Sequence, residues 1–113
     1  MLSFTFMLYV TSKNNLIKLE QLLKELQLWS DLSPSASAMA STEPFSCDVM
    51  ALEQWLQFIF IPKMSQLIEQ QQALPTNIAI APMAEHLWQA IPHYHALIEL
   101  LRDLDCLLSD NNY

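Results

Sequence analysis

The stretch STEPFSCDVMALEQWLQFIFIPKM, residues 41–64, decides how this chain folds. From about Cys47 its apolar residues recur at steps of three and four, which predicts a helix. Pro62 has no N–H to donate, and its ring collides with the carbonyl one turn earlier, so the helix is expected to kink or restart there. Residues 63–71 can continue as a second helical segment. The expected inward face consists of Val49, Leu52, Leu56 and Ile59.

The same stretch carries more apolar surface than one buried face needs. A helix that is apolar on nearly every side is central in a bundle or has a second buried face, and exposed apolar patches mark partner sites. The expected binding edge consists of Phe45, Trp55, Phe58, Pro62 and Lys63. One alternative is that these aromatic side chains are simply core. Another is a ligand pocket between helices, lined by Trp55, Met64 and Trp88.

Helical spacing also dominates the rest of the chain. It predicts a helix from Asn15 to about Trp29, with Ser12 or Asn14 as its cap, and a shorter helix opened by Pro82. A leucine stripe then predicts a final helix from Tyr94 onward; its members are Leu97, Leu101, Leu104 and Leu108. The expected fold class is therefore all-α: a single bundle of four to five helices with a proline-kinked central helix.

The apolar opening MLSFTFMLYV is expected to form a tail, residues 1–12, outside a core domain of residues 13–113. It is shorter than the roughly 20 apolar residues that span a bilayer, and it lacks the features of a secretory signal. We therefore expect no membrane span and a cytoplasmic protein. The tail can pack on the domain, contact a second copy of the chain in a homo-oligomer, or precede a true start at Met7.

Composition argues against several classes of function. Twelve acidic against five basic residues give a net charge of −7, which repels a phosphate backbone, so direct binding of nucleic acid is not expected. Glycine is absent, and with it the phosphate-binding loops and the nucleophile elbow. Cys47 and Cys106 are expected to be reduced thiols in a cytosolic protein.

No constellation of side chains predicts catalysis or a cofactor. His93 and His95 are two residues apart, which is not a zinc spacing, and no third ligand is placed beside them. Asp103 and Asp105 diverge on a helix and are expected to lie on a solvated face. We therefore predict no catalytic residue, no metal site and no cofactor.

Four elements together resemble the YqcC-like family of small bacterial proteins of unassigned function. They are the LEQLLKELQLW helix, STEPF followed by WLQFIFIPKM, the ALP-then-IAIAPMAE segment, and the closing ELLRDLDCLL helix. The similarity runs from about Leu16 to Asp110. It implies an all-helical bundle and a cytoplasmic, proteobacterial protein. Family members often lie in the genome beside a tRNA pseudouridine synthase, which implies an accessory role in tRNA modification. The resemblance brings no catalytic residues.

These observations predict a non-enzymatic protein–protein interaction module. The sequence does not identify the protein partner. The resemblance implies a tRNA pseudouridine synthase as one candidate. The alternatives are an accessory factor of tRNA pseudouridine modification and a small-ligand-binding helical domain.

Overall fold

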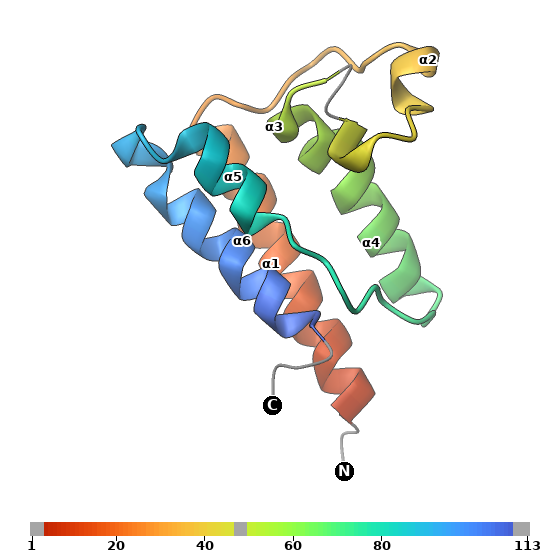
Figure 1. Cartoon of the computed structure of the whole chain (residues 1–113). Coiled ribbons are helices and arrows are strands. Elements are labelled where there is room, and N and C mark those ends of the chain that lie inside the picture. Colours follow the sequence, from red (N-terminus) through yellow and green to blue (C-terminus); the bar gives the residue numbers. More distant parts are fainter. Residues whose placement is uncertain (1–3, 47–49, 110–113) are drawn as a thin grey trace.

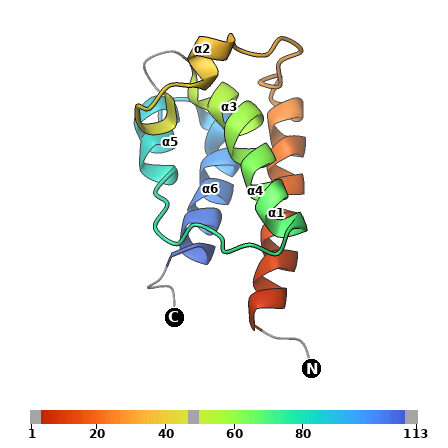
Figure 2. The same cartoon turned by 90° about the vertical axis from the view of Figure 1, so that its right-hand side faces the viewer.

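The computed structural model describes residues 4–46 and 50–109, and within these residues every regular element is helical. Two long helices and a third, composite one run roughly side by side, and a short helix, α5, packs against α6 (Figures 1 and 2). The elements in chain order are α1 (Phe4–Glu25), α2 (Ala36–Met39), the 3-10 turn η1 (Pro44–Ser46), α3 (Leu52–Trp55), the π turn η2 (Leu56–Phe60), α4 (Ile61–Glu69), α5 (Ala81–Trp88), the 3-10 turn η3 (Pro92–Tyr94) and α6 (His95–Leu107).

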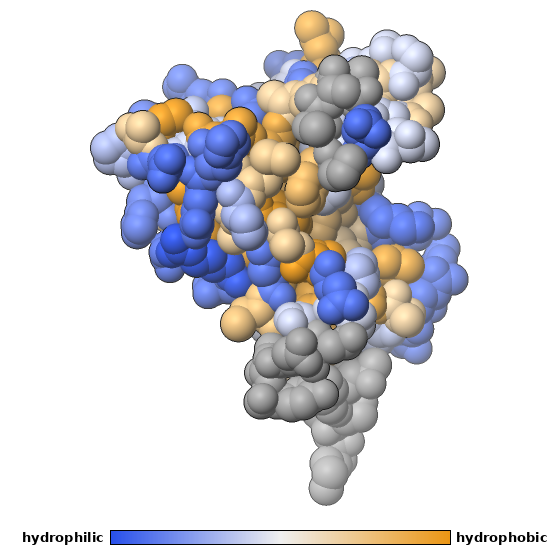
Figure 3. Space-filling view, viewed as in Figure 1, coloured by the Kyte–Doolittle hydropathy of each residue, from blue (hydrophilic) through white to orange (hydrophobic). Residues whose placement is uncertain are grey.

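The all-α bundle predicted from the sequence is confirmed. α6 packs against both α1 and α5, and α4 packs against α1. Hydrophilic residues cover the outer side of α5 and α6, while apolar residues gather in the hollow between these helices and α4 (Figure 3). Within the described ranges, no helix is both long and apolar enough to cross a membrane.

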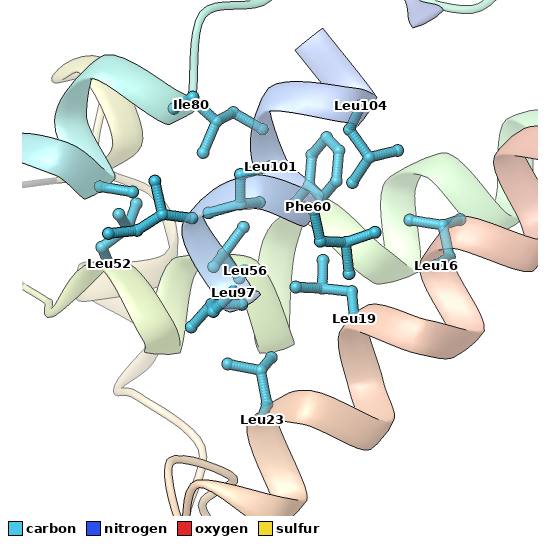
Figure 4. Packing of buried hydrophobic residues seen from close by; sticks show 14 of the residues in the cluster. Leu16, Leu19, Leu23, Leu52, Leu56, Phe60, Ile80, Leu97, Leu101 and Leu104 are labelled. Carbon is cyan, nitrogen blue, oxygen red and sulfur yellow. The ribbon is translucent and has the colours of Figure 1, made fainter. Parts of the chain in front are cut away.

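One apolar core joins the helices (Figure 4). The α-helical period of 3.6 residues brings each stripe of leucines onto one face, and those faces meet at the centre of the bundle. Side chains that are fully or almost fully buried include Leu19 and Leu23 of α1, Leu56 and Met64 of the composite helix, Ile80 before α5, and Leu97, Leu101 and Leu104 of α6. The leucine stripe predicted for the last helix is confirmed as core.

The start and the end predicted for the first helix are wrong. α1 begins at Phe4 and ends at Glu25, so Ser12 lies in mid-helix, fully buried, and does not cap it. Leu8 and Tyr9, within the predicted tail, pack partly buried against the core. From Phe4 onward, the apolar opening is part of this helix. The division into residues 1–12 and 13–113 stays a prediction about which part of the chain is needed for folding.

The hydrogen-bond pattern of the central helix changes just before Pro62, where Leu56–Phe60 form a π turn; the kink expected at Pro62 stays a prediction. Backbone angles stay α-helical at Trp55, Phe60 and Ile61, but Ile61 N–H donates to the carbonyl of Leu56, five residues earlier. Pro62 then stands in the first turn of α4, where its missing N–H costs least. The helix therefore changes its hydrogen-bond pattern before the proline without breaking.

The π turn keeps one side of the composite helix facing the core. Its buried members are four residues apart: Leu52, Leu56, Phe60 and Met64. An α-helix advances about 100° per residue, so each four-residue step overshoots a full turn by about 40°. One wider turn removes part of that drift. Leu52 and Leu56 confirm the predicted inward face, Ile59 is only half-buried, and Val49 lies outside the described residues.

Candidate functional site

Three aromatic rings from separate turns of the chain form a cluster beside the composite helix. The ring centroids of Phe45 and Trp55 are 5.0 Å apart in an edge-on arrangement. Those of Trp55 and Phe60 are 5.4 Å apart and nearly parallel. Both are favourable aromatic geometries. Trp55 is half-buried, and its ring contacts both of the others.

The cluster borders a groove of about 340 Å³. Trp55, Phe60 and Met64 line one side of it, and Ile78 and Ile80, from the segment that leads into α5, line the other. Apolar surface faces solvent in the hollow between α4 and α5 in Figure 3. Among the described residues, Lys63 is the single charged side chain in the lining. Lys63 is exposed and makes no ion pair with any residue that the structure describes.

Phe45 reaches the groove from a strained turn. Phe45 has φ 56° and ψ 18°, and Ser46 follows with φ 51°, so two adjacent residues with a Cβ occupy the left-handed region. Each such residue costs on the order of 1–3 kcal/mol and persists only where its surroundings enforce the conformation. Ser46 is buried, and its N–H donates to the carbonyl of Glu43 at 2.9 Å. These contacts hold the Phe45 ring against Trp55.

Gln57, inside the π turn, anchors the groove's helix to the chain that follows α1. Its Nε2 donates to the carbonyl of Ser30 at 2.8 Å, and its Oε1 accepts from the N–H of Ser30 at 2.8 Å. Gln57 is only 7% exposed, so both polar ends of its amide need these partners. We did not predict this pair. The sequence did offer a signal for it, because Gln57 is the one polar residue in the run Leu56–Ile61.

The structure brings together three of the five residues predicted for the binding edge. Phe45, Trp55 and Lys63 all line the groove. Phe58 is half-buried and Pro62 is exposed, and neither is part of the lining.

The alternative pocket lined by Trp55, Met64 and Trp88 divides into two neighbouring grooves. Trp88 lines a second groove of about 330 Å³ together with Met50 and Met83, and Phe45 stands in the lining of both. Trp88 is almost fully buried and packs edge-on against Tyr94, with centroids 5.6 Å apart. Of the three predicted lining residues, only Trp55 and Met64 therefore share a groove.

Asp105 does not lie on a solvated face, contrary to the sequence interpretation. It is half-buried, and its two carboxylate oxygens accept the N–H groups of Ile80 at 2.9 Å and of Ala81 at 2.8 Å. Burial raises the pKa of Asp105, and the two backbone hydrogen bonds oppose that rise. The carboxylate fixes the point at which the groove's outer segment turns into α5.

Other polar side chains serve surface contacts. Arg102 of α6 pairs with Glu85 of α5 and with Glu99, and these carboxylates raise the pKa of its guanidinium. His95 lies 3.8 Å from Glu99, and the His93 ring packs on Tyr94. In the part of the chain that the structure describes, no three histidine, cysteine or acidic side chains are grouped to hold a metal ion. Cys106 is exposed, and Cys47 lies outside that part.

Comparison with known proteins places relatives along almost the whole chain. An uncharacterised protein of Haemophilus influenzae is 42% identical over 103 residues, which cover 89% of this chain and 94% of that protein. The uncharacterised protein YqcC of Escherichia coli is 37% identical over 94 residues, covering 82% and 86%. The solution NMR structure of YqcC superposes with a TM-score of 0.81 and covers 92% of this chain. The resemblance noted from the sequence motifs is thereby confirmed.

A further relative is much longer than this chain. A Pectobacterium carotovorum protein named tRNA pseudouridine synthase C is 35% identical over 77 residues, which make up 68% of this chain but 20% of that protein. Residues 11–107 match the family DUF446, which is described as tRNA pseudouridine synthase C. This match and the full-length relatives agree, and the chain belongs to the DUF446 family together with YqcC.

Proposed function

We propose that this protein is a non-enzymatic interaction module that binds a tRNA pseudouridine synthase of the C type and assists its action on tRNA. One observation carries the proposal: a segment similar to this chain forms a fifth of a protein that bears the name of that synthase. Two domains joined in one chain meet at a high effective concentration, whereas separate chains must hold together through an interface. A free-standing relative of the segment therefore needs a surface that binds the synthase.

The apolar groove supports this proposal as the binding surface. Half-exposed Trp55 stands in its lining beside Phe45, and lone Lys63 lies among apolar neighbours. Tryptophan and tyrosine anchors in apolar pockets dominate the free energy of protein association. The lining offers contact area and a single charge, which suits recognition of a partner.

The proposal is tested with a purified tRNA pseudouridine synthase C. Isothermal titration calorimetry should detect a complex, and Trp55→Ala should weaken it about 30-fold, the equivalent of roughly 2 kcal/mol. Trp29→Ala is the matched control, because Trp29 is also half-buried against the core but lines neither groove. Thermal melting of both variants shows whether a loss of binding reflects a loss of folding.

Two results would count against the proposal. The first is the absence of a complex between wild-type protein and synthase. The second is tight, salt-sensitive binding of tRNA by the isolated chain, because its net charge of −7 should repel the phosphates. That second result would assign the chain a direct RNA role.

A further inference from the structure

The segment that forms the outer wall of the groove has the pattern of an edge β-strand. Asn77 and Ala79 are exposed and alternate with half-buried Ile78 and buried Ile80. This period of two is what an extended chain with one face on a core produces. No other described segment pairs with it: in the described residues, the backbone N–H and C=O groups of 77–79 make no hydrogen bond.

The hydrogen bonds of Asp105 fix the direction of these free groups. The N–H of Ile80 points to Asp105 on α6. In a trans peptide the carbonyl points opposite to the N–H, so the carbonyl of Ala79 points away from α6. If Ala79 is extended, as strand addition of a peptide requires, its N–H and its carbonyl lie on the same side of the chain. Ala79 therefore presents one donor and one acceptor side by side.

The groove beside this backbone edge has a defined chemistry. Its floor and inner wall are the apolar side chains of Trp55, Phe60 and Met64. Among residues 4–46 and 50–109, Lys63 is the one charged residue in the lining, and its ammonium group makes no ion pair there. A complementary occupant is extended, presents an apolar side chain and carries a carboxylate. Backbone hydrogen bonds would supply affinity, while the apolar pocket and Lys63 would supply specificity.

We propose that the groove binds an extended, acidic–apolar peptide segment that adds as a strand to the Asn77–Ala79 edge. An apolar side chain of the segment rests on Trp55, and its carboxylate pairs with Lys63. The assignment of this segment to the synthase rests on the function proposed above. The mode of binding is independent of that assignment.

The mode is tested directly with a phage-displayed library of random peptides, selected on the full chain. We expect selected peptides to combine an apolar residue with Asp or Glu. Ala79→Pro removes the N–H while keeping an extended backbone, and it should weaken a synthetic copy of the selected peptide about tenfold. Ala79→Ser, which keeps the N–H, should bind as the wild type does. Lys63→Glu should weaken binding, and Lys63→Arg should preserve it.

Hydrogen exchange supplies an independent readout in folded protein. The Ala79 amide, which has no partner within the described residues, should exchange more slowly when the peptide is bound.

A library without acidic–apolar enrichment, or peptides bound equally well by Ala79→Pro, would overturn the proposal. Wild-type affinity of the synthase for Ala79→Pro would overturn this mode and leave the proposed partner standing. Binding of the peptide without binding of the synthase would overturn the proposed partner and leave this mode of binding standing.

Discussion

Asp105 shows how one residue on α6 sets the start of another helix. The first N–H groups of a helix have no partner inside it, and a side chain of the preceding residue usually accepts them. Ahead of α5 that position holds Ile80, which cannot do so. Asp105 supplies both oxygens from across the bundle, at 2.9 Å to the Ile80 N–H and 2.8 Å to the Ala81 N–H.

Asp105→Ala should lower the free energy of unfolding by about 1–2 kcal/mol, because it leaves two N–H groups without acceptors. Urea denaturation at neutral pH measures the change. Asp103→Ala is the control, since Asp103 is exposed on the same helix. Equal stabilities of the two variants would show that solvent caps α5 in place of Asp105.

The raised pKa of Asp105 also predicts a pH dependence. A raised pKa in the folded state means that the folded protein holds this proton more tightly than the unfolded chain. The resulting stability is fully present below the unfolded pKa, about 3.8, and is lost as the pH rises through the folded pKa. Wild type should therefore lose stability relative to Asp105→Asn as the pH rises above about 3.8 and through the raised folded pKa. Urea midpoints across that range test the sign, and an opposite trend would contradict it.

At the scale of elements, two helices end in the same way without glycine. Two residues after the end of α1, Gln27 has φ 61°, and two residues after the end of α4, Gln71 has φ 53°. In each case the N–H one residue later donates five residues back, to Leu23 at 2.8 Å and to Leu67 at 2.9 Å. This is the Schellman pattern, whose left-handed residue is usually glycine because a Cβ is unfavourable there.

Gln71→Gly should therefore raise the free energy of unfolding by about 0.5–1 kcal/mol, after the greater flexibility of glycine in the unfolded chain is deducted. The neighbouring Gln70 is a matched control, because it is also exposed but has φ −90°. Gln70→Gly should give no gain. Thermal melting of the pair measures the difference, and destabilisation by Gln71→Gly would refute the account of the cap.

At the scale of the whole molecule, α1 ties its own first turns to the far end of α4. The Tyr9 hydroxyl donates to the carbonyl of Gln72 at 2.7 Å, and Leu8 packs beside it against the core. By contrast, Phe6, Met7 and Val10 each have 39% or more of their surface exposed. The first helix thus has a packed side and an exposed apolar side within the same few turns.

Truncation tests where the folding unit begins. Removing residues 1–7 should change the free energy of unfolding little, because the described side chains that are lost are largely exposed. Removing residues 1–12 should lower it by about 2 kcal/mol or more, since Leu8, Tyr9 and buried Ser12 are lost as well. If residues 13–113 melt at the temperature of the full chain, the opening lies outside the folding unit after all.

The candidate site was only partly visible in the sequence. Trp55 and Lys63 could be chosen because a tryptophan and a lone base stand out in an apolar run. Phe58 and Pro62 were grouped with them because they stand in the same apolar run, and the structure leaves both outside the groove lining. Ile78 and Ala79 could not be chosen, because they join the site only where the chain returns beside the composite helix.

What the sequence by itself determined is the helical class, the leucine faces and the position of Pro62, which suits the first turn of a helix. These follow from periodicity and from the missing N–H of proline, which are local properties. Only the tertiary structure decided the π turn, the pairing of Gln57 with Ser30 and the cap from Asp105. The two hydrogen-bonded contacts join groups 24 to 27 residues apart, and the π turn depends on several side chains that pack into one core. No local sequence pattern encodes such long-range contacts.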